Sequence, residues 1–354
     1  MDLSPNKSIR GRGAAENPAN RFEHIVYEID PDGSADEQPA PKTQFLKDAS
    51  KTIIATNDSP DIGFEASINP YRGCEHGCIY CYARPTHEYL GMSAGLDFET
   101  KIMVKENAPE LLRRELSSKR WTPKPLAMSG VTDPYQPIER KLQLTRRCLE
   151  VLAEFRNPVS IVTKNYLVTR DLDLLSELAR YQAVLVFISV TTLDGELARI
   201  MEPRTAQPAR RLQAIEALSK AGVPIGVLVA PLIPGLTDHE MPSIISAAAK
   251  AGAKQAGFVP IRLPYAVAPL FEEWLTRHKP ARKERVLVAI RAIRGGKLND
   301  PNFGSRMNGQ GIFAEQFSAL FEAACRKAGL NQESFSLSTA FFRRAGEKQL
   351  SLFE

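Results

Sequence analysis

The chain has 354 residues, 43% of them hydrophobic, which is enough to bury one large core. A formal net charge of +5 is mildly basic, so the charge alone does not indicate a nucleic-acid-binding protein. No apolar run approaches the length of a membrane span, and the polar N-terminus lacks the apolar centre of a signal peptide. We therefore expect a soluble, cytoplasmic protein without a membrane partner.

Residues 1–45 are rich in Asn, Pro, Gly and charged residues and poor in periodic apolar positions. Basic residues predominate in the first half of this segment, and a run of acidic residues follows between positions 23 and 37. Such a composition predicts a disordered or extended N-terminal arm.

Strand and helix signals alternate from Ala66 onward. The predicted strands are short buried-type runs at 66–69, 125–129, 159–163, 184–190, 224–230 and 255–260. Runs of this kind are typical of parallel strands that are covered on both faces. Apolar residues at helical spacing lie between them, for example Leu142, Leu149 and Leu152. The pattern predicts an α/β fold, an open six-stranded parallel (β/α)6 barrel of the TIM type over residues 60–265, with a helical extension at 266–335.

The loop after the first predicted strand holds three of the five cysteines. Cys74, Cys78 and Cys81 have the spacing C-x3-C-x2-C, and an aromatic residue, Tyr80, precedes the third. A loop this short can direct three thiolates at one metal centre. Three thiolates on a four-iron cluster leave one iron without a protein ligand, so that a reactant can bind there. The crowding and the odd number of cysteines argue against disulfides.

A structural zinc ion is the alternative interpretation of the same loop. His76 or His87 could supply a fourth ligand and complete a small nucleic-acid-binding module. Such a module would be non-enzymatic, and it would not need the repeated strand–helix units that follow.

The pattern C-x3-C-x-aromatic-C is similar to the signature of the radical S-adenosylmethionine (radical SAM) superfamily. Polar motifs at the later strand ends resemble, in their order, one branch of it: spore photoproduct lyase and the related DNA repair photolyase-like proteins. The resemblance covers roughly residues 65–260. The motifs that match are Asn69-Pro70-Tyr71, Cys81-Tyr82, Thr132-Asp133, Val162-Thr163-Lys164, Ser189, Glu202-Pro203 and Val229-Ala230-Pro231.

This resemblance implies that the three cysteines bind a [4Fe-4S] cluster. The cluster would reductively cleave S-adenosylmethionine to a 5′-deoxyadenosyl radical, which abstracts hydrogen from a substrate, and the electron would come from a flavodoxin- or ferredoxin-type reductant. By position, Thr132, Lys164 and Ser189 would reach the methionyl end of S-adenosylmethionine. A lysine and two hydroxyls suit its carboxylate. Tyr80 and the backbone near Pro231 would contact the adenine.

The resemblance departs from the lyases at one position. In those enzymes a cysteine at the end of the second strand returns a hydrogen atom to the product, and here that position is Gly130. Tyr82, which matches a tyrosine of the hydrogen relay, is retained and is the predicted catalytic residue. Cys148 and Cys325 lie in predicted helices and are expected in the core. Damaged DNA is the first substrate class to consider, while a protein or a small molecule stays open.

Two features near the C-terminus also suggest DNA. Eight basic residues and one acidic residue lie between Arg277 and Lys297, and apolar residues recur there at helical spacing, which fits either phosphate contacts or a solvated face. A flexible tail is expected at 340–354. Within it the peptide QLSLF, Gln349–Phe353, resembles the pentapeptide by which bacterial repair proteins bind the sliding clamp.

Overall fold

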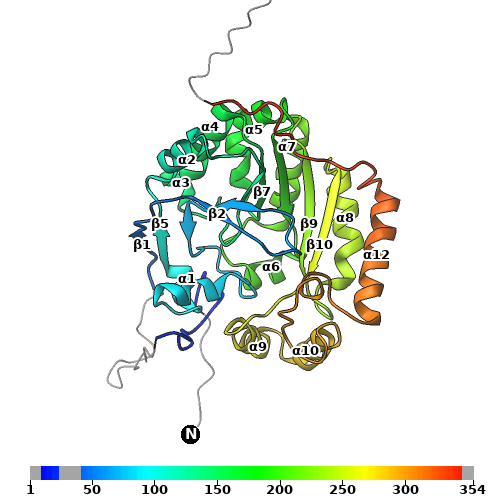
Figure 1. Cartoon of the computed structure of the whole chain (residues 1–354). Helices are drawn as coiled ribbons and strands as arrows, with labels where there is room; N and C mark the ends of the chain where they lie inside the picture. Colours follow the sequence, from blue (N-terminus) through cyan, green and yellow to red (C-terminus); the bar gives the residue numbers. More distant parts are fainter. Residues whose placement is uncertain (1–8, 24–40, 345–354) are drawn as a thin grey trace, which may run out of the picture.

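The computed structural model describes residues 9–23 and 41–344, and a sheet of mostly parallel strands forms its centre (Figure 1). In the described residues this sheet has seven strands, in the order β10-β9-β8-β7-β6-β3-β2. All neighbours pair in parallel except β2 and β3. The strands are β2 (Ile54–Thr56), β3 (Ala66–Ile68), β6 (Leu126–Met128), β7 (Val159–Thr163), β8 (Val184–Ser189), β9 (Ile225–Leu232) and β10 (Gln255–Pro260). The prediction of an α/β fold built on parallel strands is confirmed.

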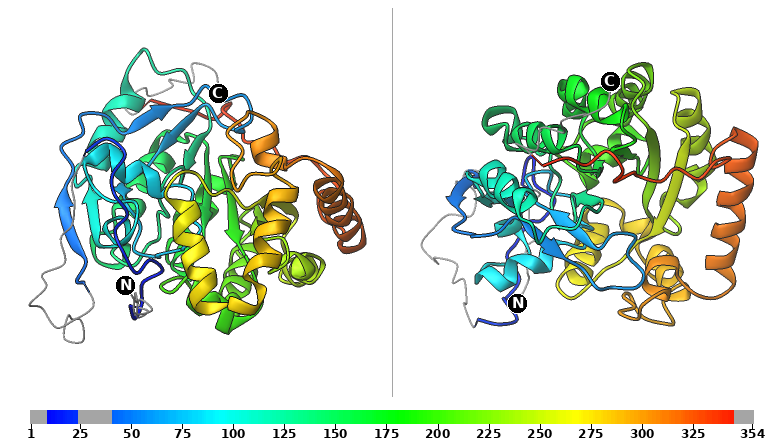
Figure 2. Two further views of the ribbon diagram at one scale, coloured as in Figure 1. Left: turned by 90° about the horizontal axis from the view of Figure 1, so that it is seen from below. Right: turned by 45° about the horizontal axis from the view of Figure 1, so that its top comes forward.

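Helices connect these strands and cover the outer face of the sheet (Figures 1 and 2). The helices of this layer are α2 (Ala108–Ser117), α3 (Glu139–Leu142), α4 (Leu144–Phe155), η2 (Tyr166–Asp171), α5 (Leu172–Ala179), α7 (Pro208–Lys220), η3 (Asp238–Glu240) and α8 (Met241–Lys250). The helix α6 (Gly195–Met201) lies instead at the carboxyl ends of the strands (Figure 1), where Leu197 and Met201 belong to a second buried cluster. The predicted helix that starts at Leu142 is in fact two helices. Gln143 between them has a left-handed backbone with φ of 51°, so α3 ends and α4 starts in a new direction, and Leu142 is left 36% exposed.

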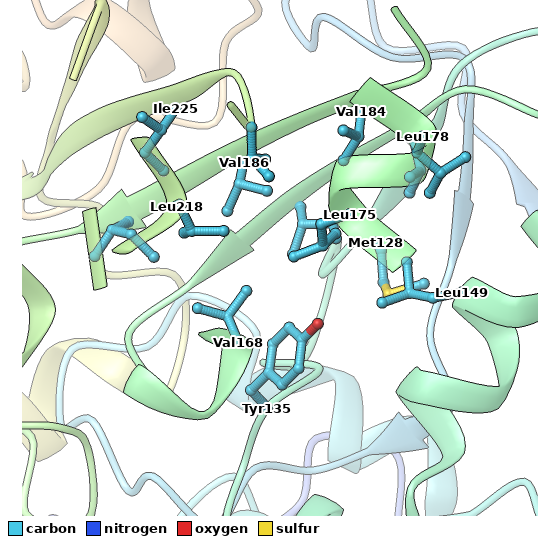
Figure 3. Close-up of a cluster of buried hydrophobic side chains, with 14 of the residues drawn as sticks. Met128, Tyr135, Leu149, Val168, Leu175, Leu178, Val184, Val186, Leu218 and Ile225 are labelled. Carbon is cyan, nitrogen blue, oxygen red and sulfur yellow. The ribbon is translucent and has the colours of Figure 1, made fainter. Parts of the chain in front are cut away.

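The main core lies between the sheet and these helices (Figure 3). Met128 of β6, Val184 of β8 and Leu149 of α4 are among its fully buried members. Burying such side chains contributes roughly 1.5–3 kcal/mol each to folding. Cys148 and Cys325 belong to the same core, as predicted, and their burial raises the pKa values of both thiols.

A second, three-stranded sheet leads into the cysteine loop. Its order is β1 (Gln44–Lys47), β5 (Lys101–Val104) and β4 (Tyr71–Arg72). The loop starts directly after β4, and η1 (Arg84–Leu90) and α1 (Leu96–Thr100) follow it before β5 returns. This small sheet therefore fixes both ends of the segment that carries the cysteines.

The N-terminal arm was predicted to be disordered or extended, and its described part, residues 9–23, contains neither helix nor strand. These residues pack against the cysteine loop, where Ala14 is only 1% exposed. The backbone amides of Gly13 and Ala14 donate to the buried carboxylate of Glu99 at 3.0 and 2.8 Å. The ordering comes from contacts with a distant part of the chain, which composition does not reveal. Residues 1–8 and 24–40 lie outside the described residues.

The predicted helical extension contains α9 (Val267–His278), η4 (Pro280–Arg282), α10 (Lys283–Ala292), α11 (Ser305–Asn308) and α12 (Ile312–Ala328). The apolar side of α10 is buried. One of the eight basic residues does not belong to a cationic surface: Arg294 is 1% exposed and donates to the carbonyls of Pro260 and Ile261. Among the described residues, no helix is long and apolar enough to cross a membrane.

Part of the expected flexible tail is also packed. The ring of Phe342 lies 6.2 Å from the ring of Phe155, and the amide of Arg343 donates to the Phe155 carbonyl at 2.9 Å. The peptide Gln349–Phe353 lies outside the described residues, so its role stays a prediction.

Candidate cofactor site at the strand ends

The three cysteines lie in a loop at the carboxyl ends of the parallel strands. Cys74 and Cys78 are each 7% exposed, and Cys81 is partly buried. Desolvation raises the pKa of the Cys78 thiol well above its ordinary value, and desolvation together with the neighbouring Cys74 raises that of Cys81 to about 11. The thiols therefore interact with one another, and a bound cation would be needed to stabilise them as thiolates.

The backbone of this loop depends on glycine. Gly73 and Gly77 have φ of +80° and +66°, in the left-handed region where a side chain is strained. A Cβ at Gly77 would come within 2.7 Å of the Glu99 carboxylate. The loop consequently follows a path that other residues could not adopt without strain.

A buried ion pair between Arg84 and Glu99 supports the loop from beneath. Both side chains are fully buried. The Arg84 guanidinium donates to Glu99 and to the carbonyls of Cys78 at 3.0 Å and Gly77 at 3.3 Å. Glu99 in turn accepts the amides of the N-terminal segment. Sequence reasoning missed this pair, since a buried arginine and a glutamate fifteen residues apart form no recognisable motif.

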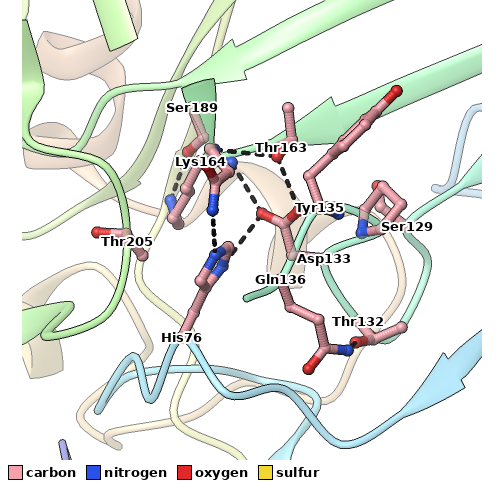
Figure 4. A network of polar contacts seen from close by, with 12 residues as sticks. His76, Ser129, Thr132, Asp133, Tyr135, Gln136, Thr163, Lys164, Ser189 and Thr205 are labelled. Carbon is pink, nitrogen blue, oxygen red and sulfur yellow. Dashed lines mark hydrogen bonds and ion pairs between the residues drawn. The ribbon is translucent and has the colours of Figure 1, made fainter. Parts of the chain in front are cut away.

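His76, between the first two cysteines, belongs to a polar network with the ends of β6 and β7 (Figure 4). Its Nδ1 lies 3.3 Å from Asp133 Oδ2, and its Nε2 lies 3.1 Å from the Asn165 amide nitrogen. Asp133 also accepts from the Thr163 hydroxyl at 2.7 Å and from the Lys164 amide at 2.8 Å. Burial opposes a charge on His76, but Asp133 and Cys74 outweigh it and raise the His76 pKa to about 10.

These contacts bear on the zinc interpretation. Both ring nitrogens of His76 are engaged, and Nε2 of His87 lies 2.9 Å from the Lys101 carbonyl oxygen. Neither ring nitrogen of His76 is therefore free to act as a fourth ligand in this arrangement, whereas Nδ1 of His87 is buried and has no hydrogen-bond partner among the described residues. Within residues 9–23 and 41–344, no three His, Cys, Asp or Glu side chains, the three cysteines included, are grouped around a common position for one metal ion, which applies equally to zinc and to an iron–sulfur cluster.

Lys164 and Ser189, two of the predicted cofactor-binding residues, meet at the ends of β7 and β8. Lys164 Nζ lies 2.5 Å from Ser189 Oγ and 3.0 Å from the Ala230 carbonyl oxygen. The Ser189 hydroxyl donates to the same carbonyl at 2.7 Å, and the bond from Ala230 to Pro231 is cis. Burial, with the nearby Arg211, lowers the Lys164 pKa to about 8. The structure thus brings Lys164, Ser189 and Pro231 together.

Tyr80 connects the cysteine loop to this group. Its side chain is 5% exposed, its hydroxyl donates to the carboxylate of Glu202, and Lys164 Nζ lies 5.7 Å from the centre of its ring. Glu202 also forms an ion pair with Arg211, and both side chains are buried. Glu202 was noted only as part of a motif, and its pairing with an arginine nine residues later was not predicted.

Thr132 lies apart from the lysine and serine. Its hydroxyl donates to the Gly73 carbonyl at 2.8 Å and accepts from the Gln136 amide at 3.1 Å. In the structure it therefore ties the end of β6 to the start of the cysteine loop. Its predicted contact with the methionyl group stays a prediction.

Tyr82 and Gly130 are neighbours, as their proposed correspondence to the hydrogen relay requires. The Tyr82 side chain is 49% exposed, and its hydroxyl donates to the Gly130 carbonyl at 2.9 Å. A Cβ at Gly130 would meet nothing closer than Ser67 Oγ at 3.6 Å, so the position has room for a side chain. Arg262 covers one side of Tyr82, with its guanidinium carbon 5.6 Å from the centre of the ring.

The arrangement as a whole suits a metal centre and a ligand that carries a carboxylate group and an aromatic ring. Three thiols could hold the metal centre, the Lys164 ammonium could bind a carboxylate, and Tyr80 offers an aromatic face. Tyr82 sits beside them at the surface, where a substrate could approach. Most of these groups are buried and hydrogen-bonded, which fixes their positions before a ligand binds.

Comparison with known proteins identifies relatives of this chain. A family model described as the radical SAM superfamily matches residues 68–248. An uncharacterized protein of Mycobacterium tuberculosis is 39% identical over 219 residues, which are 61% of this chain and 64% of that protein, so the chain spans less than two thirds of its length. An uncharacterized protein of Methanocaldococcus jannaschii is 31% identical over 200 residues, which are 56% of this chain and 71% of that protein.

Solved structures with a similar fold include mutants of spore photoproduct lyase. One of them has a TM-score of 0.59 at 16% identity, over 81% of this chain and 80% of that chain. Another, with bound AdoMet and dinucleoside spore photoproduct, has a TM-score of 0.56 at 17% identity over the same shares. At such low identity the likeness shows the fold alone.

Proposed function

The chain belongs to the radical SAM superfamily, and we propose that it is an enzyme that uses a [4Fe-4S] cluster and S-adenosylmethionine to abstract a hydrogen atom from damaged DNA. The observation that carries this proposal is the position of Cys74, Cys78 and Cys81, in one loop at the strand ends beside the buried Lys164–Ser189 pair. The central sheet would then be the open six-stranded barrel of this superfamily. When bound, the cluster supplies the electron that splits a carbon–sulfur bond of S-adenosylmethionine into methionine and a 5′-deoxyadenosyl radical.

The residues around the loop would bind and orient the cofactor. The Lys164 ammonium would bind the carboxylate, which could replace the neutral oxygens of Ser189 and Ala230, while the Glu202 carboxylate lies 3.5 Å from the same ammonium. Tyr80 would pack against the adenine, held in place by its bond to Glu202. Because Tyr80 is buried and the Lys164 side chain is only 15% exposed, water is largely excluded from the position where a reactive group would form.

Arg262 supports an anionic substrate such as DNA. Its Nε is buried and has no hydrogen-bond partner among the described residues, and its Nη1 makes a long contact, of 3.4 Å, with the Met307 sulfur. A buried, unpaired donor is costly, so an incoming phosphate that accepts from it would be favoured. The same guanidinium covers Tyr82, and the phosphate would therefore be held next to the proposed relay tyrosine.

Cofactor chemistry is tested on the anaerobically reconstituted protein. We expect bound iron and sulfide, and the formation of 5′-deoxyadenosine when a reductant and S-adenosylmethionine are added. Cys78→Ala should lose both, while Cys325→Ala, at a cysteine in the core away from the loop, should keep both. An unchanged yield of 5′-deoxyadenosine in Cys78→Ala would refute the proposal. A colourless protein with one zinc per chain and no affinity for S-adenosylmethionine would support the zinc-binding module instead.

The substrate is tested with deuterium-labelled candidates, starting with ultraviolet-damaged DNA. The proposal predicts that deuterium from the DNA appears in 5′-deoxyadenosine, or in the adenosyl group of regenerated S-adenosylmethionine. It also predicts that Arg262→Gln weakens DNA binding without changing the uncoupled cleavage of S-adenosylmethionine. If deuterium were transferred from a peptide or a metabolite and none from DNA, the protein would still be a radical enzyme, but DNA would not be its substrate.

A further inference from the structure

A cavity of about 260 Å³ lies beside the cysteine loop. Its lining comes from the loops that follow β7 and α6, from the short helix η2 and from the helices α3 and α7. The lining residues are Arg140, Asn165, Tyr166, Leu167, Arg204, Thr205, Ala206 and Arg210. None of them belongs to the Tyr82, Gly130 and Arg262 group, where we propose that the substrate binds.

The lining carries positive charge that the described residues do not neutralise. Arg140 and Arg210 are exposed, and neither forms an ion pair with a described residue. Among the described residues, the Arg210 guanidinium donates only to the neutral Gln213 amide, at 2.8 Å, and its carbon lies 3.7 Å from the centre of the Tyr166 ring. Arg204 pairs with Glu75 at 3.0 Å, but Glu75 is itself only 3% exposed. Three guanidinium groups therefore meet one buried carboxylate, and the face is cationic towards solvent.

The wall of the cavity is bonded directly to the residues between Cys74 and Cys78. The Arg204 amide donates to the His76 carbonyl at 3.3 Å, and the Asn165 amide nitrogen lies 3.1 Å from His76 Nε2. The Arg204 guanidinium reaches Glu75, the residue that follows Cys74. A molecule seated on this face is thus separated from the cysteine loop by a single layer of side chains.

We propose that this arginine-lined face is the docking site of an acidic, flavodoxin-type electron-transfer protein. The inference rests on the proposed function, which requires one electron for each S-adenosylmethionine that is cleaved. The reduced flavin of the partner gives up that electron and is oxidised by one electron, while the iron–sulfur group of the enzyme is reduced by one. Carboxylates around the partner's flavin would be steered to the arginines, and one of them could enter the cavity.

The experiment compares two ways of supplying the electron. In the double variant Arg140→Glu/Arg210→Glu, formation of 5′-deoxyadenosine driven by reduced flavodoxin should fall at least tenfold at low salt, while formation driven by dithionite, a small inorganic reductant, should be unchanged. The flavodoxin-driven rate of the wild-type protein should also fall as salt is added, because salt screens the exposed charges. The matched control is Arg326→Glu/Lys327→Glu, the same charge change on exposed residues of α12, which should leave both rates unchanged.

Several results would overturn the docking site. The first is an unchanged flavodoxin-driven rate in the double variant. The second is a dithionite-driven rate that falls as much as the flavodoxin-driven rate, which would assign the arginines to the cofactor site. The third is a flavodoxin-driven rate that falls as much in the α12 control as in the double variant. A loss of oligonucleotide binding together with an unchanged flavodoxin-driven rate would make the face a nucleic-acid site. A wild-type protein that forms no 5′-deoxyadenosine with dithionite would instead refute the proposed function, on which the inference depends.

Discussion

Lys164 is a buried cation whose charge depends on pH near neutrality. Burial and the neighbouring Arg211 lower its pKa to about 8, so roughly 90% of it is charged at pH 7 and roughly 10% at pH 9. If only the ammonium binds the carboxylate of S-adenosylmethionine, the apparent dissociation constant should rise about tenfold between these two pH values. Equilibrium binding by the reconstituted protein measures this change.

The control for this prediction is Lys164→Met, which should bind more weakly at pH 7 and show a smaller pH dependence, due to the cofactor's own groups. A change in folding stability caused by the titration of Lys164 would not produce the same loss of binding at high pH. Its pKa is lower in the folded protein than the ordinary 10.5, so the unfolded chain holds more protons between about pH 8 and 10.5 and stability rises with pH there. A pH profile equal to that of the variant would show that Lys164 does not bind the carboxylate.

Gly130 is a glycine that the backbone does not require. Its φ is outside the left-handed region, and a Cβ would lie 3.6 Å or more from its nearest neighbours. We expect Gly130→Cys to keep its free energy of unfolding within about 0.5 kcal/mol of wild type and to place a thiol beside the Tyr82 hydroxyl. Denaturant unfolding measures the first point, and thiol titration of the native protein measures the second.

Gly226→Cys is the matched comparison, because Gly226 is buried and a Cβ there would lie 2.4 Å from the partly buried ring of Phe187. It should be destabilised by about 1–3 kcal/mol. If Gly130→Cys were destabilised to the same extent, the space beside Tyr82 would be smaller than the structure indicates, and the absence of the donor cysteine would have a steric cause.

Between β4 and β5, the segment with the cysteine loop is held by the Arg84–Glu99 pair. Removing one partner of a fully buried ion pair leaves the other charge uncompensated, which costs about 3–5 kcal/mol. Arg84→Met should therefore lower the free energy of unfolding by that amount and release the carbonyls of Gly77 and Cys78. Denaturant unfolding and the iron content after reconstitution are the measurements.

The exposed pair of Arg113 and Glu154 provides the comparison, with side chains 48% and 36% exposed. Arg113→Met should cost no more than about 1 kcal/mol and leave the iron content unchanged. Equal costs for the two arginines would mean that the Arg84 pair is far better solvated than its burial indicates.

The N-terminal segment 9–23 is the second element that shapes the loop. A Cβ at Gly13 would lie 1.8 Å from the Gly77 carbonyl oxygen, an overlap that forces the two chains apart. We expect Gly13→Ala to release this segment, so that it is cleaved by protease and the protein retains less iron. Gly63→Ala, at a glycine with no atom within 4 Å of the added methyl group, should behave as wild type. Resistance to protease in Gly13→Ala would show that the contact is dispensable.

Local patterns predicted the elements better than the contacts between them. The six parallel strands are where continuous apolar runs indicated, since such runs are buried whichever neighbours cover them. Lys164 and Ser189 were predicted from the order of motifs that resembles the lyase branch, and the structure places both at the ends of neighbouring strands. Three features were not predicted: the Arg84–Glu99 pair, the packing of Ala14 and the break at Gln143. Each depends on residues far apart in the sequence or on a left-handed backbone that glycine usually marks.

At the scale of the whole molecule, the two ends of the parallel strands have different roles. The cysteine loop and Lys164 lie at the carboxyl ends, whereas the C-terminal segment 331–344 crosses the amino ends (Figure 2). Its backbone pairs with residues that precede the strands: Ser338 donates to the Gln182 carbonyl, and Arg343 donates to the Phe155 carbonyl. The last described residue, Arg344, bonds to the Trp121 carbonyl at 3.1 Å, so the chain leaves the described structure on the side away from the candidate site.

This separation leads to a prediction for the clamp-binding peptide. A chain that ends at residue 344 keeps the whole packed segment and loses only Gln349–Phe353 and its neighbours. We expect this truncation to abolish binding to a bacterial sliding clamp, measured by surface plasmon resonance, because the apolar residues of the peptide are its anchors. The rate of 5′-deoxyadenosine formation and the melting temperature should not change.

The substitution Leu352→Ala/Phe353→Ala in the full chain should reproduce the loss of clamp binding, whereas Glu354→Ala should not. A fall in 5′-deoxyadenosine formation on truncation would mean that the peptide reaches the cofactor site, which the exit of the chain at the amino ends of the strands argues against.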